Sequence, residues 1–585
     1  MKYLIAILPI FIMLTLAPAL MAVPNNAYAQ NNAIQSISQI QGATQLGICL
    51  SGIDTFISCN NLNLQNQINT GSNALAQDGG NGKYSGNSAV QAIGQEQSSD
   101  QVAVCISAEG TFLSCNNLNL QNQINTGSNL ALQDGGNGKY SGNSAVQAIG
   151  QEQSSSQRAL VLSGGDIGLS GNNLNVQNQI NTGSNALAQD GGNGKGSGNS
   201  AAQGIGQSQS SSQSAGCVSG GDVSQSCNNL NIQNQINTGS NALAQDGGNG
   251  KGSGNSAAQG IGQSQSSSQR SQCVAGGSLD NSCNNLSSQN QVNTGNNAAA
   301  QSGGNGKGSG NSAAQGIGQS QSSSQNAQCV SGEDAIVSCN NVEFQNQVNS
   351  GSNALAQFGL DNNGNQGGAR HGGNGEGISA AQGIGQSQSS SQRSGVLSAG
   401  NSFLSGNNLN LQNQVNEGDN LALQSGGYGG GNTLAQGIGQ SQDSNQRSSV
   451  VTGESSIGSG NNINIQNQEN NGDNLAAQSS EGNGDNTENA GAQSLAQSQG
   501  TEDDAGDDNG GDSSDGDTTK AQAANTESDG GDDNDDNGSS DDNGSSDDNG
   551  SSDDNGSSDD GGDDGGDDGG DDGGDDGGDE GASEE

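Results

Sequence analysis

The ten cysteines are the residues whose type and spacing most directly suggest chemistry. Nine residues separate the members of each pair, and the pairs are Cys49/Cys59, Cys105/Cys115, Cys217/Cys227, Cys273/Cys283 and Cys329/Cys339. At three equivalent places both cysteines are replaced together, by Val161 and Gly171, Val396 and Gly406, and Val450 and Gly460. Joint loss within one chain indicates that the members of a pair bond to each other. We therefore predict five disulfides, each closing a short hairpin and each worth roughly 2–3 kcal/mol.

Metal binding and free catalytic thiols are the other uses of such cysteines. The CxxC spacing of zinc sites is absent, and the only histidine, His371, lies in a segment that occurs once. Without histidine in the repeats, the commonest general acid–base group is missing, and G-x-S-x-G and H-E-x-x-H motifs do not occur. We therefore expect no enzyme activity and no catalytic or cofactor-binding residue.

The cysteine pairs belong to a repeat with a period of 56 residues. The sixth copy carries an 11-residue insertion around 360–371, and the seventh is two residues shorter. A fixed period of this length predicts stacked units that each contact only their neighbours. Marked at the first cysteine position, the eight copies begin at Cys49, Cys105, Val161, Cys217, Cys273, Cys329, Val396 and Val450.

Asparagine and glutamine hold the same positions in all eight copies. If the units stack, identical amides lie one step apart and hydrogen-bond along the stack. Alternation of apolar and amide residues over 117–125 predicts a strand, and the absence of proline after Pro24 favours continuous β-pairing. The alternative is a disordered prion-like tract, although such tracts drift in spacing. In the first two copies the predicted ladder residues are Gln65, Gln67, Asn69, Asn73, Gln121, Gln123, Asn125 and Asn129.

The two ends of the chain differ from the repeats. Residues 1–29 read as a signal peptide, with Lys2, an apolar run over 4–23 and an Ala27-Tyr28-Ala29 cleavage site; an uncleaved anchor is the alternative. After cleavage we expect no membrane span and a secreted protein, extracellular or on the cell surface, where disulfides form. Residues 30–500 hold the repeats. Residues 501–585 carry 34 of the 60 acidic residues and should be disordered.

The acidic tail contains candidate binding and modification sites. Asp533, Asp535 and Asn537 match the start of an EF-hand-type loop, but the twelfth position is Gly544 rather than glutamate. We therefore expect weak, diffuse binding of divalent cations such as calcium. The net charge of −48 disfavours nucleic acid as a partner. Asn-Gly-Ser glycosylation sequons begin at Asn537, Asn543, Asn549 and Asn555.

The repeats resemble curlin repeats, the Gln/Asn/Gly-rich units of bacterial curli fibres. The similarity lies in the stretch 142–147 with Gln151, and in Gln123-x-Asn125-x-Gly127-x-Asn129 with Gln133. The period and the paired cysteines differ from that family. The resemblance, which covers residues 33–500, implies that the repeats form an all-β solenoid; the disordered acidic tail that follows is predicted from its composition.

Two functions therefore compete at the level of sequence. The first is a structural protein of a surface fibre, biofilm matrix or adhesin that associates with itself and with cell-surface components. The alternative is an extracellular calcium- or mineral-binding matrix protein that acts through its tail.

Overall fold

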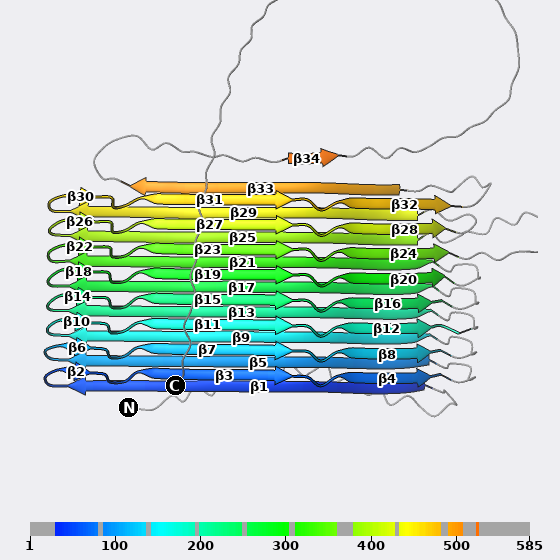
Figure 1. Cartoon of the computed structure of the whole chain (residues 1–585), viewed down its shortest axis with the longest axis horizontal. Coiled ribbons are helices and arrows are strands. Elements are labelled where there is room, and N and C mark those ends of the chain that lie inside the picture. Colours follow the sequence, from blue (N-terminus) through cyan, green and yellow to red (C-terminus); the bar gives the residue numbers. More distant parts are fainter. Residues whose placement is uncertain are drawn as a thin grey trace, which may run out of the picture. The chain divides into compact units, whose positions relative to one another are not determined.

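The computed structural model describes residues 30–79, 86–135, 142–192, 198–247, 254–303, 310–359, 378–426, 432–480, 490–506 and 522–525. The chain divides into two units, Met1–Ser528 and Asp529–Glu585, and every described residue lies in the first. These residues form a helix-free stack of parallel strands, an all-β solenoid (Figure 1). The predicted signal peptide and most of the predicted tail lie outside the described residues.

Each 56-residue copy makes one turn of the solenoid, which we call a rung. A rung contains a long strand, a two-residue strand, a nine-residue strand and a short strand, in that order. Every strand pairs in parallel with its equivalent in the next copy, so that Gln91 lies beside Gln147. The long strands are β1 (Gln30–Ser51), β5 (Gly86–Ser107), β9 (Asn143–Ser163), β13 (Asn199–Ser219), β17 (Asn255–Ala275), β21 (Asn311–Ser331), β25 (Ile378–Ser398), β29 (Asn432–Thr452) and β33 (Ala490–Gly506).

The remaining strands complete the rungs. The two-residue strands are β2 (Thr55–Phe56), β6 (Thr111–Phe112), β10 (Ile167–Gly168), β14 (Val223–Ser224), β18 (Leu279–Asp280), β22 (Ala335–Ile336), β26 (Ser402–Phe403) and β30 (Ser456–Ile457). The nine-residue strands are β3 (Asn61–Asn69), β7 (Asn117–Asn125), β11 (Asn173–Asn181), β15 (Asn229–Asn237), β19 (Asn285–Asn293), β23 (Asn341–Asn349), β27 (Asn408–Asn416) and β31 (Asn462–Asn470). The short strands are β4 (Asn73–Asp78), β8 (Asn129–Asp134), β12 (Asn185–Asp190), β16 (Asn241–Asp246), β20 (Asn297–Gly303), β24 (Asn353–Gly359), β28 (Asn420–Gly426) and β32 (Asn474–Ser480).

The strands form four sheets, one for each kind of strand. The long strands make one layer, and the nine-residue and short strands make the layer that faces it (Figure 1). Because a rung starts with its long strand, the chain from Gln30 begins a complete rung. At the other end β33 is a ninth long strand, and β34 (Gln522–Asn525) pairs with it antiparallel. Both strands extend into the segment predicted as the tail.

The predicted hairpins at the cysteine pairs are wrong. The long strand and the nine-residue strand on either side of each pair belong to different sheets, and each pairs only with its copies in neighbouring rungs. Those parallel neighbours take the backbone hydrogen bonds that a hairpin would use. The segment between the two cysteines is therefore a corner of the solenoid, which we call the cystine corner. The five cystine corners are Cys49–Cys59, Cys105–Cys115, Cys217–Cys227, Cys273–Cys283 and Cys329–Cys339.

The interior of the stack combines amides with three apolar columns. Cysteine, valine and alanine fill the cystine corners, an isoleucine column runs along the long strands, and alanine and leucine meet beneath the short strands. Beneath the nine-residue strands the usual orientation is reversed: Asn119, Gln121 and Gln123 are buried, and Leu118 and Leu120 point outward and are partly exposed. Hydrogen bonds of side-chain amides must therefore stabilise this part of the interior.

Close approach of the backbones explains one invariant glycine. Gly127 lies in the bend between β7 and β8, stacked on Gly71 of the rung below. A Cβ atom at Gly127 would overlap the carbonyl oxygen of Gly71. Only glycine lets neighbouring rungs approach this closely at the bend.

Candidate functional site

Interior glutamines form continuous ladders along the stack. Nε2 of Gln147 donates to Oε1 of Gln91 in the rung below at 2.8 Å and to the backbone carbonyl of Ala186 in the facing layer at 3.0 Å. Its own Oε1 accepts from Nε2 of Gln203 in the rung above at 2.7 Å. Each ladder therefore joins neighbouring rungs and also joins the two layers, and the buried amide uses both of its N–H groups.

Interior asparagines form ladders with the opposite polarity. Nδ2 of Asn119 donates upward to Oδ1 of Asn175 at 2.8 Å, whereas the glutamines donate downward. The same nitrogen also donates across the interior to Oγ of Ser155 at 2.9 Å. Amide dipoles of the two kinds therefore run in opposite directions along the stack.

The eight predicted ladder residues lie in neighbouring rungs and bond in four pairs. Gln121 donates to Gln65 at 2.8 Å, Gln123 to Gln67 at 3.1 Å, Asn69 to Asn125 at 2.9 Å and Asn73 to Asn129 at 2.9 Å. Seven of them are buried, and Gln65, in the first rung, is partly exposed. Sequence reasoning did not single out the further ladder that contains Gln157, which bonds to Gln101 at 2.9 Å. Its glutamine occurs in every copy, which is the signal that could have revealed it.

The five predicted cysteine pairs are the five disulfides of the structure. Their Cα–Cα distances are 6.0 or 6.1 Å. The bonding partners predicted from the joint loss are therefore right, although corners rather than hairpins surround them. The bonded pairs are Cys49 with Cys59, Cys105 with Cys115, Cys217 with Cys227, Cys273 with Cys283 and Cys329 with Cys339.

The second cysteine of each pair has a left-handed backbone conformation, which is a further reason why the predicted hairpin is wrong. A hairpin closed by a disulfide would place both cysteines on extended strands, whereas the sharp corner needs a positive φ at the second one. A side chain is strained in this region, and only the second position of each pair has it. The φ angles are 55° at Cys59, 59° at Cys115, 55° at Cys227, 58° at Cys283 and 58° at Cys339.

The rungs without cysteine form the same corner with a valine and a glycine in place of the disulfide. Gly171 takes the second position with a φ of 70° in the rung that has Val161 at the first. A Cβ at Gly171 would lie 2.9 Å from Cγ2 of Val161, so valine fills the space that a second sulfur would occupy. The joint replacement thus relieves backbone strain and preserves packing.

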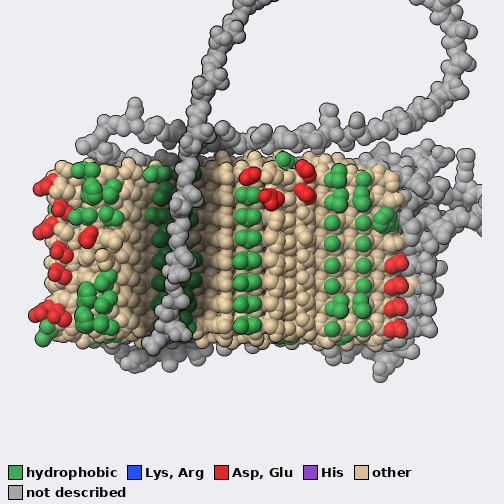
Figure 2. Space-filling view, viewed as in Figure 1, with side chains coloured by type: hydrophobic (Ala, Val, Ile, Leu, Met, Phe, Trp, Pro, Cys, Tyr) green, Lys and Arg blue, Asp and Glu red, His purple; other side chains and the backbone are tan. Residues whose placement is uncertain are grey.

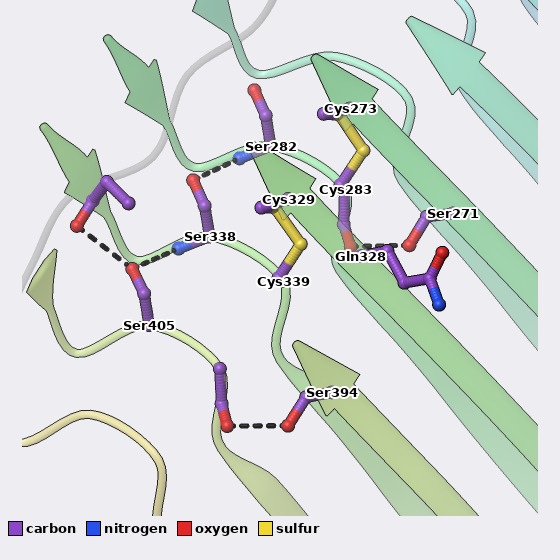
Figure 3. Close-up of a disulfide and its surroundings, with 12 residues drawn as sticks. Ser271, Cys273, Ser282, Cys283, Gln328, Cys329, Ser338, Cys339, Ser394 and Ser405 are labelled. Atoms are coloured by element: carbon purple, nitrogen blue, oxygen red, sulfur yellow. Dashed lines mark hydrogen bonds between the residues drawn. A yellow bond between two sulfur atoms is a disulfide. The ribbon is translucent and has the colours of Figure 1, made fainter. Parts of the chain in front are cut away.

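A column of serines, which sequence reasoning missed, runs through the cystine corners (Figure 3). The backbone N–H of Ser282 donates to Oγ of Ser338 at 3.2 Å, and that of Ser338 donates to Oγ of Ser405 at 3.0 Å. The hydroxyl of Ser338 in turn donates to the carbonyl of Ile336 at 2.9 Å. Ser338 lies between two left-handed residues, Val337 and Cys339, and satisfies backbone groups that the sharp corner leaves outside the sheet ladders.

One carboxyl group interrupts an interior asparagine column. Glu343 replaces asparagine in the sixth rung and is fully buried. Burial raises the pKa of Glu343 to about 7, although a hydrogen bond from Ser390 Oγ, at 2.6 Å, favours the ionised form. Among the described residues, Oδ1 of Asn410, the next residue in the column, has no hydrogen-bond partner, because a carboxyl group lacks the N–H groups with which asparagine donates along the column.

The outer face of the nine-residue strands carries apolar columns beside an amide column (Figure 2). Ile232, Leu286 and Phe344 are about two-fifths exposed there. Between the apolar columns, Asn178 donates to Asn122 at 2.8 Å in an outer ladder. Figure 2 shows a column of acidic side chains at the edge of this face where the short strands end; β4, β8, β12 and β16 end with Asp78, Asp134, Asp190 and Asp246.

The cysteines do not form a metal site. Sulfur atoms of Cys217, Cys227 and Cys273 lie within 4.8 Å of one another because cystines of neighbouring rungs stack. All three are bonded in disulfides. The candidate cation ligands Asp533, Asp535 and Asn537, and the sequons at Asn537, Asn543, Asn549 and Asn555, lie outside the described residues. Among the described residues there is no helix long and apolar enough to cross a bilayer.

The ladders, the cystine corners and the exposed columns are features of a stack rather than of a pocket with converging reactive groups. Comparisons with family models, with curated proteins and with solved structures find no match to this chain.

Proposed function

We propose that this chain is a secreted structural subunit of a cell-surface fibre, biofilm matrix or adhesin, that it has no enzyme activity, and that its copies join end to end. The observation that carries the proposal is the polarity of the ladders. In the first rung, Gln41 Nε2 bonds only to the carbonyl of Asn66 among the described residues, whereas Gln97 also donates to Gln41. In the last nine-residue strand, Asn470 Nδ2 is buried and has no acceptor in the described part of the chain.

The hydrogen-bonding groups at the two ends of the stack are therefore complementary. Asn470 corresponds to Asn69 of the first rung. Along this column each asparagine accepts from the one below, as Asn125 accepts from Asn69, but no described asparagine donates to Oδ1 of Asn69. A second copy stacked on the last rung would supply that acceptor. Backbone groups at the open edges of strands favour the same pairing. Five disulfides support an oxidising, extracellular location.

Electron microscopy of the secreted protein, with and without reductant and calcium, tests this proposal. We expect fibres, and we expect their X-ray diffraction to contain a reflection at about 4.7 Å along the fibre axis. A protein that stays monomeric at high concentration under all these conditions would contradict it.

A pair of matched variants tests the role of the first rung. Lysine substitution of Gln41 and Gln45 puts two charges on the inward side of β1, where a docked copy would bury them, so assembly should be lost. Lysine substitution of Ser36 and Ser38 adds the same charges on the outward side of the same strand and should preserve assembly. Equal assembly by both variants would exclude end-to-end docking at β1.

A further inference from the structure

The four sheets do not end together at the C-terminal end of the stack. Among the described residues, the sheets of two-residue, nine-residue and short strands each contain eight strands, but the long-strand sheet contains nine parallel strands because β33 pairs with β29. The position of β33 is where the long strand of another rung belongs. A second copy can therefore continue all four sheets at once only if its β1 takes the place of β33.

The identity of the residues in β33 makes it a poor ninth member of the sheet. In the lower rungs, Oε1 of each glutamine accepts from the glutamine above, as Gln392 does from Gln446 at 2.7 Å. The residue in register above Gln446 is Asp503, and an aspartate has no N–H to donate. Oε1 of Gln446 is buried and has no hydrogen-bond partner in the part of the chain that the structure describes.

The first long strand has the residue that β33 lacks. Gln45 holds the position of Gln446 in the first rung, and Gln101 already bonds to it in the ladder at 2.7 Å. β1 also contains 22 residues, against 17 in β33. Placed on β29, β1 of a second copy would donate to Gln446 and extend the pairing beyond Ser449, where the described pairing with β33 ends.

We propose that β33 is an internal cap on the edge of β29, and that β1 of a second copy displaces it when two copies join. The inference rests on the proposed function and specifies which strands pair where two copies meet. β34 pairs antiparallel with β33 along Ser494–Gln497, which closes that stretch of the outer edge against parallel addition. Because the cap is covalently attached, its effective concentration is high and it delays assembly until the better-matched strand arrives.

A matched pair of full-length variants tests the cap. Asp503→Gln supplies the missing donor above Gln446 and should slow assembly at least tenfold relative to wild type. Asp504→Gln removes the same charge at the neighbouring register position, opposite Arg447, without adding a donor above Gln446, and should not slow assembly relative to wild type. Asp503→Gln assembling as fast as Asp504→Gln would overturn the proposal.

A second experiment uses the soluble full chain and does not depend on fibres. The probe is a synthetic peptide of residues 30–51 with Cys49→Val, and the readout is amide hydrogen exchange over Ala490–Gly506. The peptide should accelerate exchange in β33 at least tenfold, and the same peptide with Gln45→Asp should have a much smaller effect. No acceleration by the first peptide would overturn the proposal, even if the wild-type protein forms fibres. Displacement of β33 in a protein that never forms fibres would support the cap and count against the proposed function.

Discussion

Two of the amide columns in the nine-residue strands lie one residue apart along the chain and therefore face opposite sides of the sheet. Gln177 bonds to Gln121 at 2.8 Å in the interior, and Asn178 bonds to Asn122 at 2.8 Å on the outer face. Gln177 has an exposed fraction of 0%, whereas Asn178 is partly exposed to water. The bonds have the same length, but only the inner partners lack water as a substitute. Burial, rather than bond geometry, therefore decides how much a ladder stabilises the stack.

The largest effect is expected from breaking the inner column. Gln177→Leu removes the donor to Oε1 of Gln121 and the acceptor for one N–H of Gln233. The other N–H of Gln233 keeps its bond to Ser266, so two buried hydrogen-bonding groups are left without a partner. At about 2 kcal/mol for each group, the variant should lose about 4 kcal/mol of unfolding free energy. Urea unfolding of wild type and variant side by side measures the loss. A loss below about 1 kcal/mol would contradict a decisive role for burial.

The next effect should come from repairing an interior column at Glu343. Glu343→Asn restores a donor to Asn410, as in the other rungs with asparagine at this position. With the pKa raised from 4.5 to about 7, the variant should gain about 3 kcal/mol at pH 8. At pH 4 the gain should be small. Urea unfolding at the two pH values gives both numbers.

The sign of this pH dependence follows from the raised pKa. Below about pH 4.5, Glu343 is protonated in both states, so its burial costs no ionisation energy. Between about pH 4.5 and 7 the unfolded chain releases the proton first, so the contribution of Glu343 to stability falls as the pH rises. If the free energy of unfolding of Glu343→Asn exceeded that of wild type by the same amount at every pH from 4 to 8, the raised pKa of Glu343 would be excluded as the cause.

A smaller effect is expected at the cystine corner, where packing and a covalent bond replace amide hydrogen bonds. Combining Cys217→Val with Cys227→Gly copies the corner of the third rung and should cost about 2 kcal/mol, the lower range for loss of a disulfide. Combining Cys217→Ser with Cys227→Ser should cost more, because it buries hydroxyls and keeps a side chain at the left-handed position. Thermal unfolding of the two double variants decides the order. If both lost the same stability, valine and glycine would not offset any of the loss of the disulfide.

The smallest effect is expected on the outer column. Asn178→Ala removes bonds to Asn122 and Asn234, but water can reach the groups that remain. The variant should lose no more than about 0.5 kcal/mol, measured by the same urea unfolding as Gln177→Leu. If the losses of the two variants were similar, the difference between the inner and outer ladders would disappear.

The repeat predicted much of this architecture. The constant period places identical residues in neighbouring rungs, as with Gln65 and Gln121, and the joint loss of cysteines indicated all five disulfides. Alternation predicted strands with two faces but did not say which face is inside. Comparison of the copies contains that information: the position of Leu120 becomes valine, isoleucine, serine or phenylalanine in other rungs, whereas the neighbouring Gln121 is always glutamine.

The corner, the buried carboxyl and the ninth long strand, β33, could not be predicted, for physical reasons. A turn-like segment between two cysteines, such as Cys273 and Cys283, fits a hairpin or a solenoid corner equally well, and only the partner strands decide between them. The pKa of Glu343 depends on its burial, which requires the inside-out orientation of β23. Residues 501–506 have the composition of the tail, but β33 continues through them because its first part keeps register with β29. The residues that hold this register are Gln493, Gln497 and Gln499.

The stack tolerates connections of different length after its short strands. Asn349 bonds to Asn416 at 2.8 Å across a separation of 67 residues, and Asn416 bonds to Asn470 at 2.7 Å across 54. The extra residues lie between Gly359 and Ile378, and the ladders on both sides keep their register. A polymer of such rungs could therefore carry peptides inserted between a short strand and the next long strand, at regular intervals of multiples of about 4.8 Å, without any change to the contacts of the interior.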